Sequence, residues 1–181
     1  MNFIEAGLAY HVSDPTLWRL DRRKGGGRAI MDLGVYPIQA CRYATGEEPV
    51  AVTAQGFTHD KDRFKDIYET FFWQFEFPSG TVANCTTSYS SYVDRFYASC
   101  YKGWYRLHPS FNGGGSGGET SDGPMNLTKV NQQAAHMDDF AQSIIEGSPL
   151  RVNASEGLQD LRIIEAIKLA IESGERVGVG A

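Results

Sequence analysis

The chain has 181 residues, of which 41% are hydrophobic and 12% aromatic, and this suffices for a single domain with a substantial core. Its net charge of −5 and the lack of a long basic run argue against a nucleic-acid partner. No apolar stretch approaches the ~18–20 residues of a membrane span, so no membrane partner is expected. The three scattered cysteines lack C-x-x-C spacing, which indicates a reducing compartment and no metal site.

The N-terminal segment opens with residues 3–12, whose loose alternation of apolar and polar positions predicts a β-strand. Asp14-Pro15 marks the end of that strand. Residues 16–27 follow as a charged segment that closes on three glycines. Most of its basic side chains are expected to lie in a solvated loop.

The apolar run after the three glycines predicts a helix that ends at Thr45-Gly46. Asp32 and Tyr36 lie four residues apart in it, so a continuous helix would place their Cβ atoms about 5–6 Å apart on one face. Gly34 is a weak helix former, and Pro37 predicts a kink. This pattern suggests a ligand site. The alternative is that Asp32 caps a helix end and Tyr36 is an ordinary half-buried tyrosine.

From residue 50 the hydrophobic period changes to two, which predicts strands. Residues 50–58, 68–77, 81–90 and 94–101 are joined by short connections, and they predict an antiparallel meander that continues after Lys102-Gly103. The charged residues 59–67 are expected to form a solvated loop. The strongest strand should turn its odd-numbered aromatic residues toward a helix, namely Phe71, Trp73, Phe75 and Phe77.

The second face of the predicted sheet is also aromatic, and we expect it to be a self-association surface. The alternative is that some of these rings pack under loops. The candidates for this face are Tyr68, Phe72, Tyr89, Tyr92, Tyr97 and Tyr101.

The Gly-rich residues 112–126 contain the letters of a dinucleotide fingerprint, but no apolar helix follows them. We therefore predict a flexible loop there. Two helices are expected after it, at about 131–146 and 155–173, with a capping box at Asn153 and Glu156 and a short edge strand in the tail. The apolar stripe of the first helix is expected to comprise Met137, Phe140, Ala141, Ile144 and Ile145. For the second helix it is expected to comprise Leu158, Leu161, Ile164, Ile167 and Ile171.

These elements together predict an α+β fold, a mostly antiparallel open β-sheet with helices packed on one face, over residues 1–181 as a single domain. The helices should cover the Phe71–Phe77 face. His136 and Asp138 lie near the start of the first late helix, where acids are favoured by the helix dipole, so no site is assigned to them.

Two motifs give the chain a family resemblance: G-G-G-R-A-I-M-D-L-G-V-Y-P, and R-Y-A-T-G-E-E-P after it. Together they resemble the C-terminal domain of the Gfo/Idh/MocA oxidoreductases, especially the glucose–fructose oxidoreductase branch. Members of this family begin with a nucleotide-binding Rossmann domain, which this sequence lacks, so we expect Met1 to lie at a domain boundary. The resemblance implies a sugar substrate, NADP or NAD as the cofactor of the full-length protein, and a homo-oligomer formed through the open sheet face.

The resemblance also implies roles for four residues. Tyr36 would be the catalytic acid/base, where many relatives use histidine, and Asp32 would orient the substrate or share its proton network. Trp18 and Arg19 would lie near the nicotinamide and the substrate, with Arg19 a candidate contact to either. The family's activating lysine belongs to an E-K-P motif in the absent domain. The 181 residues alone are therefore expected to be inactive and to bind no cofactor tightly.

Two other readings stay open. The chain could be a free-standing sheet module for oligomerisation or ligand binding, with no redox role. Among enzymes, it could belong to a non-sugar dehydrogenase, such as a dihydrodiol or an imine/biliverdin-type reductase. Cysteine usage favours the cytoplasm, while a periplasmic location stays open if a natural N-terminal segment precedes Met1.

Overall fold

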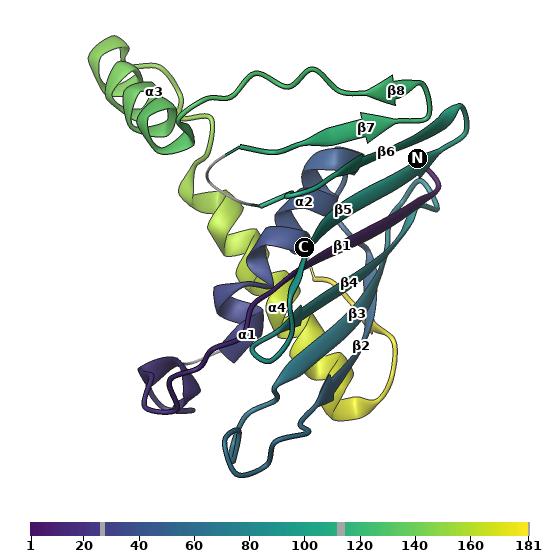
Figure 1. The fold of residues 1–181 in the computed structure, drawn as a ribbon, viewed down its shortest axis with the longest axis vertical. Helices are drawn as coiled ribbons and strands as arrows, with labels where there is room; N and C mark the ends of the chain where they lie inside the picture. Colours follow the sequence, from purple (N-terminus) through teal and green to yellow (C-terminus); the bar gives the residue numbers. More distant parts are fainter. Residues whose placement is uncertain (26–27, 112–114, 181) are drawn as a thin grey trace.

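A nine-stranded β-sheet with helices on one face dominates the computed structural model, which describes residues 1–25, 28–111 and 115–180 (Figure 1). The first half contains β1 (Phe3–Ala9), the 3-10 helix η1 (Trp18–Leu20), α1 (Arg28–Asp32), α2 (Val35–Thr45), β2 (Ala51–Phe57), β3 (Thr70–Glu76) and β4 (Val82–Ser88). The second half contains β5 (Val93–Cys100), β6 (Gly103–Leu107), β7 (Gly118–Thr120), β8 (Gly123–Pro124), α3 (Gln132–Glu146), α4 (Ala154–Ser173) and β9 (Val177–Gly178). The predicted α+β class and mostly antiparallel open sheet are confirmed.

The strand order β8-β7-β6-β5-β1-β4-β3-β2-β9 corrects the predicted meander at one point. The first strand of the chain lies in the middle of the sheet, parallel to β4 and antiparallel to β5. Ile4 pairs with Ala83 on one side and with Ala98 on the other. β4 and β5 are therefore not neighbours, although they follow one another in sequence. Each of the other pairings among the described strands is antiparallel.

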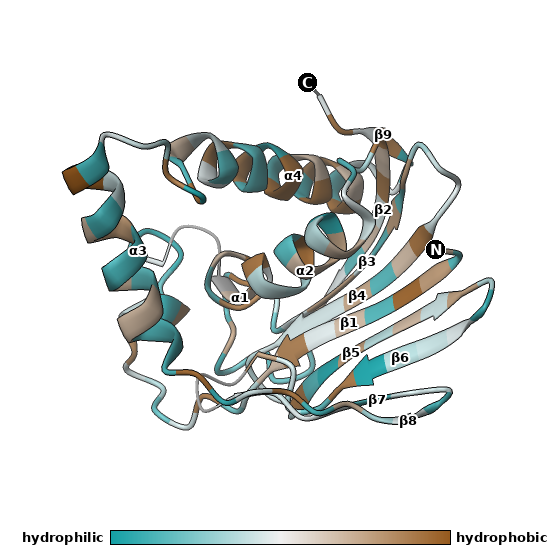
Figure 2. Ribbon diagram, turned by 90° about the horizontal axis from the view of Figure 1, so that it is seen from above, coloured by the Kyte–Doolittle hydropathy of each residue, from teal (hydrophilic) through white to brown (hydrophobic). Residues whose placement is uncertain are grey.

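The helix-covered face of the sheet contains the aromatic residues predicted for it. Phe71, Trp73, Phe75 and Phe77 are all buried, and burial of such a side chain contributes about 1.5–3 kcal/mol. In Figure 2, α1, α2 and α4 lie over this face. The buried side of α4 is shifted from the predicted stripe, since Leu158 and Leu161 are exposed. Its buried apolar residues are Ile163, Ile164, Ala166, Ile167 and Ala170.

The predicted single helix with a kink at Pro37 is instead two helices, α1 and α2, that separate at Leu33-Gly34. Pro37 lies in the first turn of α2, where its missing N–H costs no helical hydrogen bond. The break comes earlier because of how closely the backbone packs at Gly34. A Cβ added there would lie 2.5 Å from the carbonyl oxygen of Ile30, so α1 and α2 meet at a spacing that only glycine allows.

The interface between α2 and α4 is joined by a buried cation. The side chain of Arg42 is 8% exposed, and its guanidinium binds the carboxylates of Glu48, Glu156 and Asp160 at 2.7–2.9 Å. Asp160 also accepts a hydrogen bond from Gln39 at 2.6 Å. The Glu156 carboxylate, on α4, thus binds Arg42 on α2. The predicted cap of α4 is confirmed for Asn153, whose Oδ1 accepts from the N–H of Ser155.

Several segments differ from their predicted form. The 59–67 connection is not purely solvated, since Phe64 and Ile67 are buried in it. Part of the predicted 112–126 loop forms β7 and β8, while residues 112–114 lie outside the described residues. Helix α3 forms where predicted but stands apart from the sheet, so the expectation that both late helices cover the Phe71–Phe77 face is wrong for α3 (Figures 1 and 2). None of the helices in the described part is long and apolar enough to cross a membrane.

Candidate functional site

Asp32, the last residue of α1, lies at the centre of a polar cluster formed by four segments of the chain. Its Oδ2 accepts a hydrogen bond from the Tyr10 hydroxyl at 3.1 Å and another from the Tyr89 hydroxyl at 3.0 Å. The Nε of Arg19, in η1, lies 3.1 Å from the same oxygen. Tyr10 follows β1 and Tyr89 follows β4, and because these strands are parallel neighbours, both tyrosines emerge at the same edge of the sheet.

Both phenols of this cluster are held in their neutral form. Burial raises the pKa of Tyr89 far above its ordinary value, and the negative charge of Asp32 adds to this. Burial also raises the pKa of Tyr10, again with a contribution from the Asp32 charge and a small one from Tyr36. The two hydroxyls therefore act as hydrogen-bond donors that fix the carboxylate, and they cannot serve as bases near neutral pH.

The Asp32 cluster is open to solvent on one side. The Asp32 side chain is 26% exposed and that of Arg19 37% exposed, and the Arg19 guanidinium lies 4.7 Å from the centre of the exposed Trp18 ring. Within the described residues, no donor lies within hydrogen-bond distance of Asp32 Oδ1. The cluster therefore presents a carboxylate oxygen, a guanidinium and an aromatic face together at the surface.

Tyr36 lies near this opening but does not touch Asp32 through a hydrogen bond. The break at Gly34 places the two residues in different helices, which corrects the predicted pairing on one continuous helix face. The Tyr36 side chain is 46% exposed, and its ring meets Phe111 edge-on at 6.0 Å between centroids. Its hydroxyl has no hydrogen-bond partner in the part of the chain that the structure describes.

Two residues of the cluster, Tyr10 and Tyr89, were not predicted as site residues. Tyr89 was expected on the open sheet face, but it is fully buried beneath Asp32. The sequence did not predict them because it gave no sign that β1 pairs in parallel with β4. This pairing brings the rings of Tyr10 and Tyr89 to a centroid distance of 6.3 Å. His136, on α3, is exposed and lies outside the cluster.

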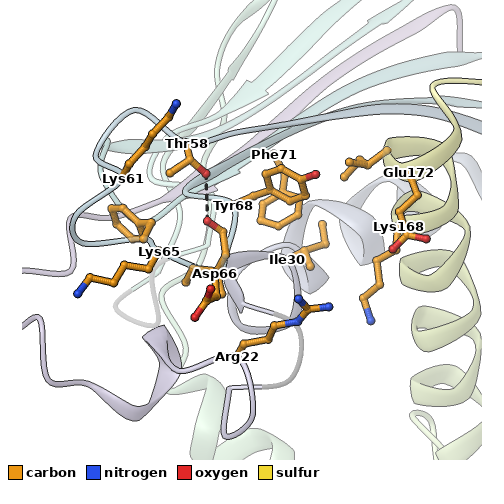
Figure 3. Close-up of a pocket in the computed structure, with 13 residues that line it drawn as sticks. Arg22, Ile30, Thr58, Lys61, Lys65, Asp66, Tyr68, Phe71, Lys168 and Glu172 are labelled. Atoms are coloured by element: carbon orange, nitrogen blue, oxygen red, sulfur yellow. Dashed lines mark hydrogen bonds between the residues drawn. The ribbon is translucent and has the colours of Figure 1, made fainter.

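A separate cavity of about 660 Å³ lies between α1, the 58–68 connection and α4 (Figure 3). Its wall includes Ile30 and Phe71. Four basic side chains and two acidic ones line it, so the charge of its wall is of mixed sign. None of the four predicted site residues lies in this wall. The charged residues are Arg22, Lys61, Lys65, Asp66, Lys168 and Glu172.

The described residues contain neither a metal-binding group of three His, Cys, Asp or Glu side chains nor a dinucleotide-binding turn. Gly118 of the fingerprint-like letters starts β7, an antiparallel strand that leads into another strand rather than a helix. The exposed polar groups around Asp32 do fit the hydroxyls of a polyol.

A mixed sheet covered by helices on one face, with an open polar cluster at the ends of two parallel strands, defines an α+β domain with a candidate ligand site. Residues 3–106 match the family described as "GFO/IDH/MocA C-terminal domain". Residues 115–179 match the "Oxidoreductase family, C-terminal alpha/beta domain". The chain belongs to the GFO/IDH/MocA family, and the resemblance inferred from its motifs is confirmed.

Individual relatives agree with this assignment. The chain is 26% identical over 173 residues to D-xylose 1-dehydrogenase (NADP(+)) of Haloarcula marismortui, covering 92% of this chain and 48% of the relative. It is 36% identical to the aldose-aldose oxidoreductase of Caulobacter crescentus, whose crystal structure with glycerol superposes with a TM-score of 0.93 over 98% of this chain and 55% of that one. Levoglucosan dehydrogenase, in complex with NADH and L-sorbose, shares the fold at 18% identity and a TM-score of 0.77, covering 99% of this chain and 58% of that one. The chain spans about half the length of these relatives.

Proposed function

We propose that the chain is the substrate-binding and oligomerisation domain of an NAD(P)-dependent oxidoreductase that transfers hydride between nicotinamide and a sugar hydroxyl or carbonyl. The observation that carries this proposal is the open Asp32 cluster, in which the buried phenol of Tyr89, the exposed phenol of Tyr10 and Arg19 hold a carboxylate at the surface beside the exposed Tyr36. The relatives' names support it, since they include a xylose dehydrogenase and an aldose-aldose oxidoreductase.

In this proposal the nicotinamide supplies the hydride chemistry, and the residues of this chain bind the sugar and move its proton. Tyr36 Oη exchanges a proton with the reacting hydroxyl, because its exposed phenol has no competing partner among the described residues. Asp32 Oδ1 accepts a hydrogen bond from a second hydroxyl. Arg19 donates to another sugar oxygen or to the cofactor, and the Trp18 ring packs against an apolar face of the sugar.

The isolated chain is expected to be inactive. To act as a base, the phenol of Tyr36 must first give up its own proton, and a nearby cation favours that charged form. Arg19 is already engaged by Asp32 at 3.1 Å. We propose that the activating lysine and the phosphate cradle both come from a preceding Rossmann domain, which would also set the preference for NADP or NAD.

The open face of the sheet is proposed as the subunit interface of a homo-oligomer. Phe57 and Phe72 are half-exposed there and meet edge-on at 5.9 Å between ring centroids. Exposed aromatic pairs of this kind suit association.

A cytoplasmic location is proposed as well. The buried thiols of Cys41 and Cys85 lie 3.6 Å apart without a bond, as fits a reducing compartment.

The test begins with the DNA upstream of Met1 and the longer protein that we propose it encodes. That protein should oxidise an aldose with NADP or NAD. Tyr36→Phe should lower kcat by about 10²–10⁴-fold without changing the melting temperature. Tyr43→Phe is the matched control, since Tyr43 is an exposed tyrosine on the same helix. Unchanged kcat in Tyr36→Phe, or sugar oxidation by residues 1–181 alone, would contradict the proposal.

A further inference from the structure

Helix α3 turns an apolar stripe toward solvent. Its side chains Met137, Phe140, Ile144 and Ile145 are between 50% and 78% exposed, although the helical spacing places them on one face. The structure describes all of residues 126–162, and in this range only Ser143 and Asp160 are buried. Four large exposed side chains on one helix form a contiguous apolar surface, which a soluble protein normally covers.

The stripe is exposed on a helix that is well defined at both ends. Asn131 Oδ1 caps it by accepting from the N–H of Ala134 at 3.0 Å, and Gly147 ends it in the left-handed conformation. Arg151 binds Asp139 at 2.9 Å beside it. A helix of 15 residues is marginal in water without packing, so its apolar face implies a partner surface.

The position of α3 indicates where the partner lies. In Figure 1, α3 and the purple segment that follows β1 project from the same side of the molecule, with α1 and the start of α2 between them. The Asp32 cluster, at the end of α1, opens in this region. A body that covered the stripe of α3 would therefore also lie against the candidate site.

The length of the relatives identifies this body. The chain covers 48% of the xylose dehydrogenase and 55% of the aldose-aldose oxidoreductase, so about as much polypeptide again is present in each. We propose that the apolar face of α3 is the docking surface for the nicotinamide-binding half of the longer protein. This inference rests on the proposed function and assigns α3 to contact between the two halves, whereas the open sheet face serves subunit contact.

The test measures the reactivity of a thiol placed in the stripe. Ile144→Cys is compared with Gln142→Cys, an exposed polar position on the same helix, both in a Cys100→Ser background because Cys41 and Cys85 are buried. In the 181-residue chain, both thiols should react with a maleimide at similar rates. When the chain is joined to the half encoded upstream, Ile144→Cys should slow by at least about tenfold, and Gln142→Cys should stay unchanged.

Two outcomes would overturn the inference. The first is a thiol at position 144 that reacts equally fast in both proteins. The second is protection that appears in the 181-residue chain and rises with its concentration, because a second copy would then cover the stripe. Aldose oxidation by the unsubstituted longer protein is read separately. If the thiol is protected but the longer protein does not oxidise sugars, the docking surface is supported and the substrate class is refuted. If the longer protein oxidises an aldose but the thiol is not protected, the substrate class is supported and the docking surface is refuted.

Discussion

Two charged clusters lie near opposite ends of α2, and they differ in how completely their groups are matched. Around Arg42, three carboxylates bind one guanidinium that is almost fully buried. Around Asp32, three donors bind one carboxylate oxygen, while Arg19 and Asp32 both remain partly exposed. The first cluster fixes α2 against α4. The second holds a charge rigidly at the surface, which is the property that a ligand site requires.

Removal of the buried cation should have the largest effect on stability. Arg42→Met leaves Asp160 buried without its cation, and we expect a loss of about 3–5 kcal/mol in the free energy of unfolding, measured by urea denaturation. Arg95→Met is the control, because the 3.7 Å pair of Arg95 with Glu5 is exposed and should cost at most about 1 kcal/mol. Equal losses in the two variants would show that the Arg42 cluster is not a structural tie.

Glu69 is the centre of a third polar cluster. Like Arg42 it is buried among its partners, but its charged group is a carboxylate. Burial acts to raise the pKa of Glu69, but hydrogen bonds from the Ser90 hydroxyl and from the N–H groups of Asp60 and His59 outweigh it and hold the pKa below its ordinary value. The folded state therefore binds this proton less readily than the unfolded state. The stabilisation is present above the ordinary pKa of glutamate and is lost as the pH falls through the lowered value.

Glu69→Gln should accordingly lower the free energy of unfolding by about 1.5–3 kcal/mol at pH 7. The difference from the wild type should shrink in strong acid, because the wild-type carboxylate is then protonated as well. Glu175→Gln is the control, since Glu175 is exposed and should show little change at either pH. A loss that is independent of pH would mean that the ionised form of Glu69 contributes nothing.

The junction between α1 and α2 sets the spacing between Asp32 and Tyr36. Gly34→Ala brings a Cβ to 2.5 Å from the Ile30 carbonyl oxygen, so the helices must separate, at a cost of about 1–3 kcal/mol. Gly157→Ala, on α4, is the matched control. Its added Cβ meets nothing within 4 Å, so it should stabilise the protein by about 0.5–1 kcal/mol. Melting curves of the two variants should shift in opposite directions.

The smallest expected change in the free energy of unfolding distinguishes Tyr89, whose hydroxyl binds Asp32, from Tyr36, whose hydroxyl is exposed. Tyr89→Phe removes a buried donor to Asp32 and should cost about 0.5–1.5 kcal/mol. Tyr36→Phe should change stability by less than about 0.5 kcal/mol, because the hydroxyl of this tyrosine is exposed and has no described partner. If Tyr36→Phe destabilised the protein as much as Tyr89→Phe, Tyr36 would belong to the scaffold.

Local patterns in the sequence predicted much of the fold correctly. The alternation of Phe71, Trp73 and Phe75 predicted the buried face of β3, because side-chain direction in a strand follows from position alone. The helix that was predicted to end at Thr45-Gly46 does end there, with Gly46 in the left-handed conformation that suits a helix C-terminus. These features depend on neighbours within a few residues, which the sequence lists directly.

Features that depend on distant residues were not predicted. The donors to Asp32 come from Tyr10 and Tyr89, which lie 22 and 57 residues away from it in sequence. They meet only because β1 pairs in parallel with β4, and no local signal specifies that pairing. The same limit applies to α3, since helical periodicity shows that Ile144 and Ile145 share an apolar face but not what covers it.

The central place of β1 has a consequence for biosynthesis. This strand leaves the ribosome before its partners β4 and β5, which follow much later. The hydrogen bond from the Thr87 hydroxyl to the Leu8 carbonyl joins residues 79 positions apart. The nascent strand must therefore wait, with both edges unpaired, until its partners have been translated. Such long-range closure belongs to the millisecond-to-second class of folding reactions, and in that interval the strand is a natural target for chaperones.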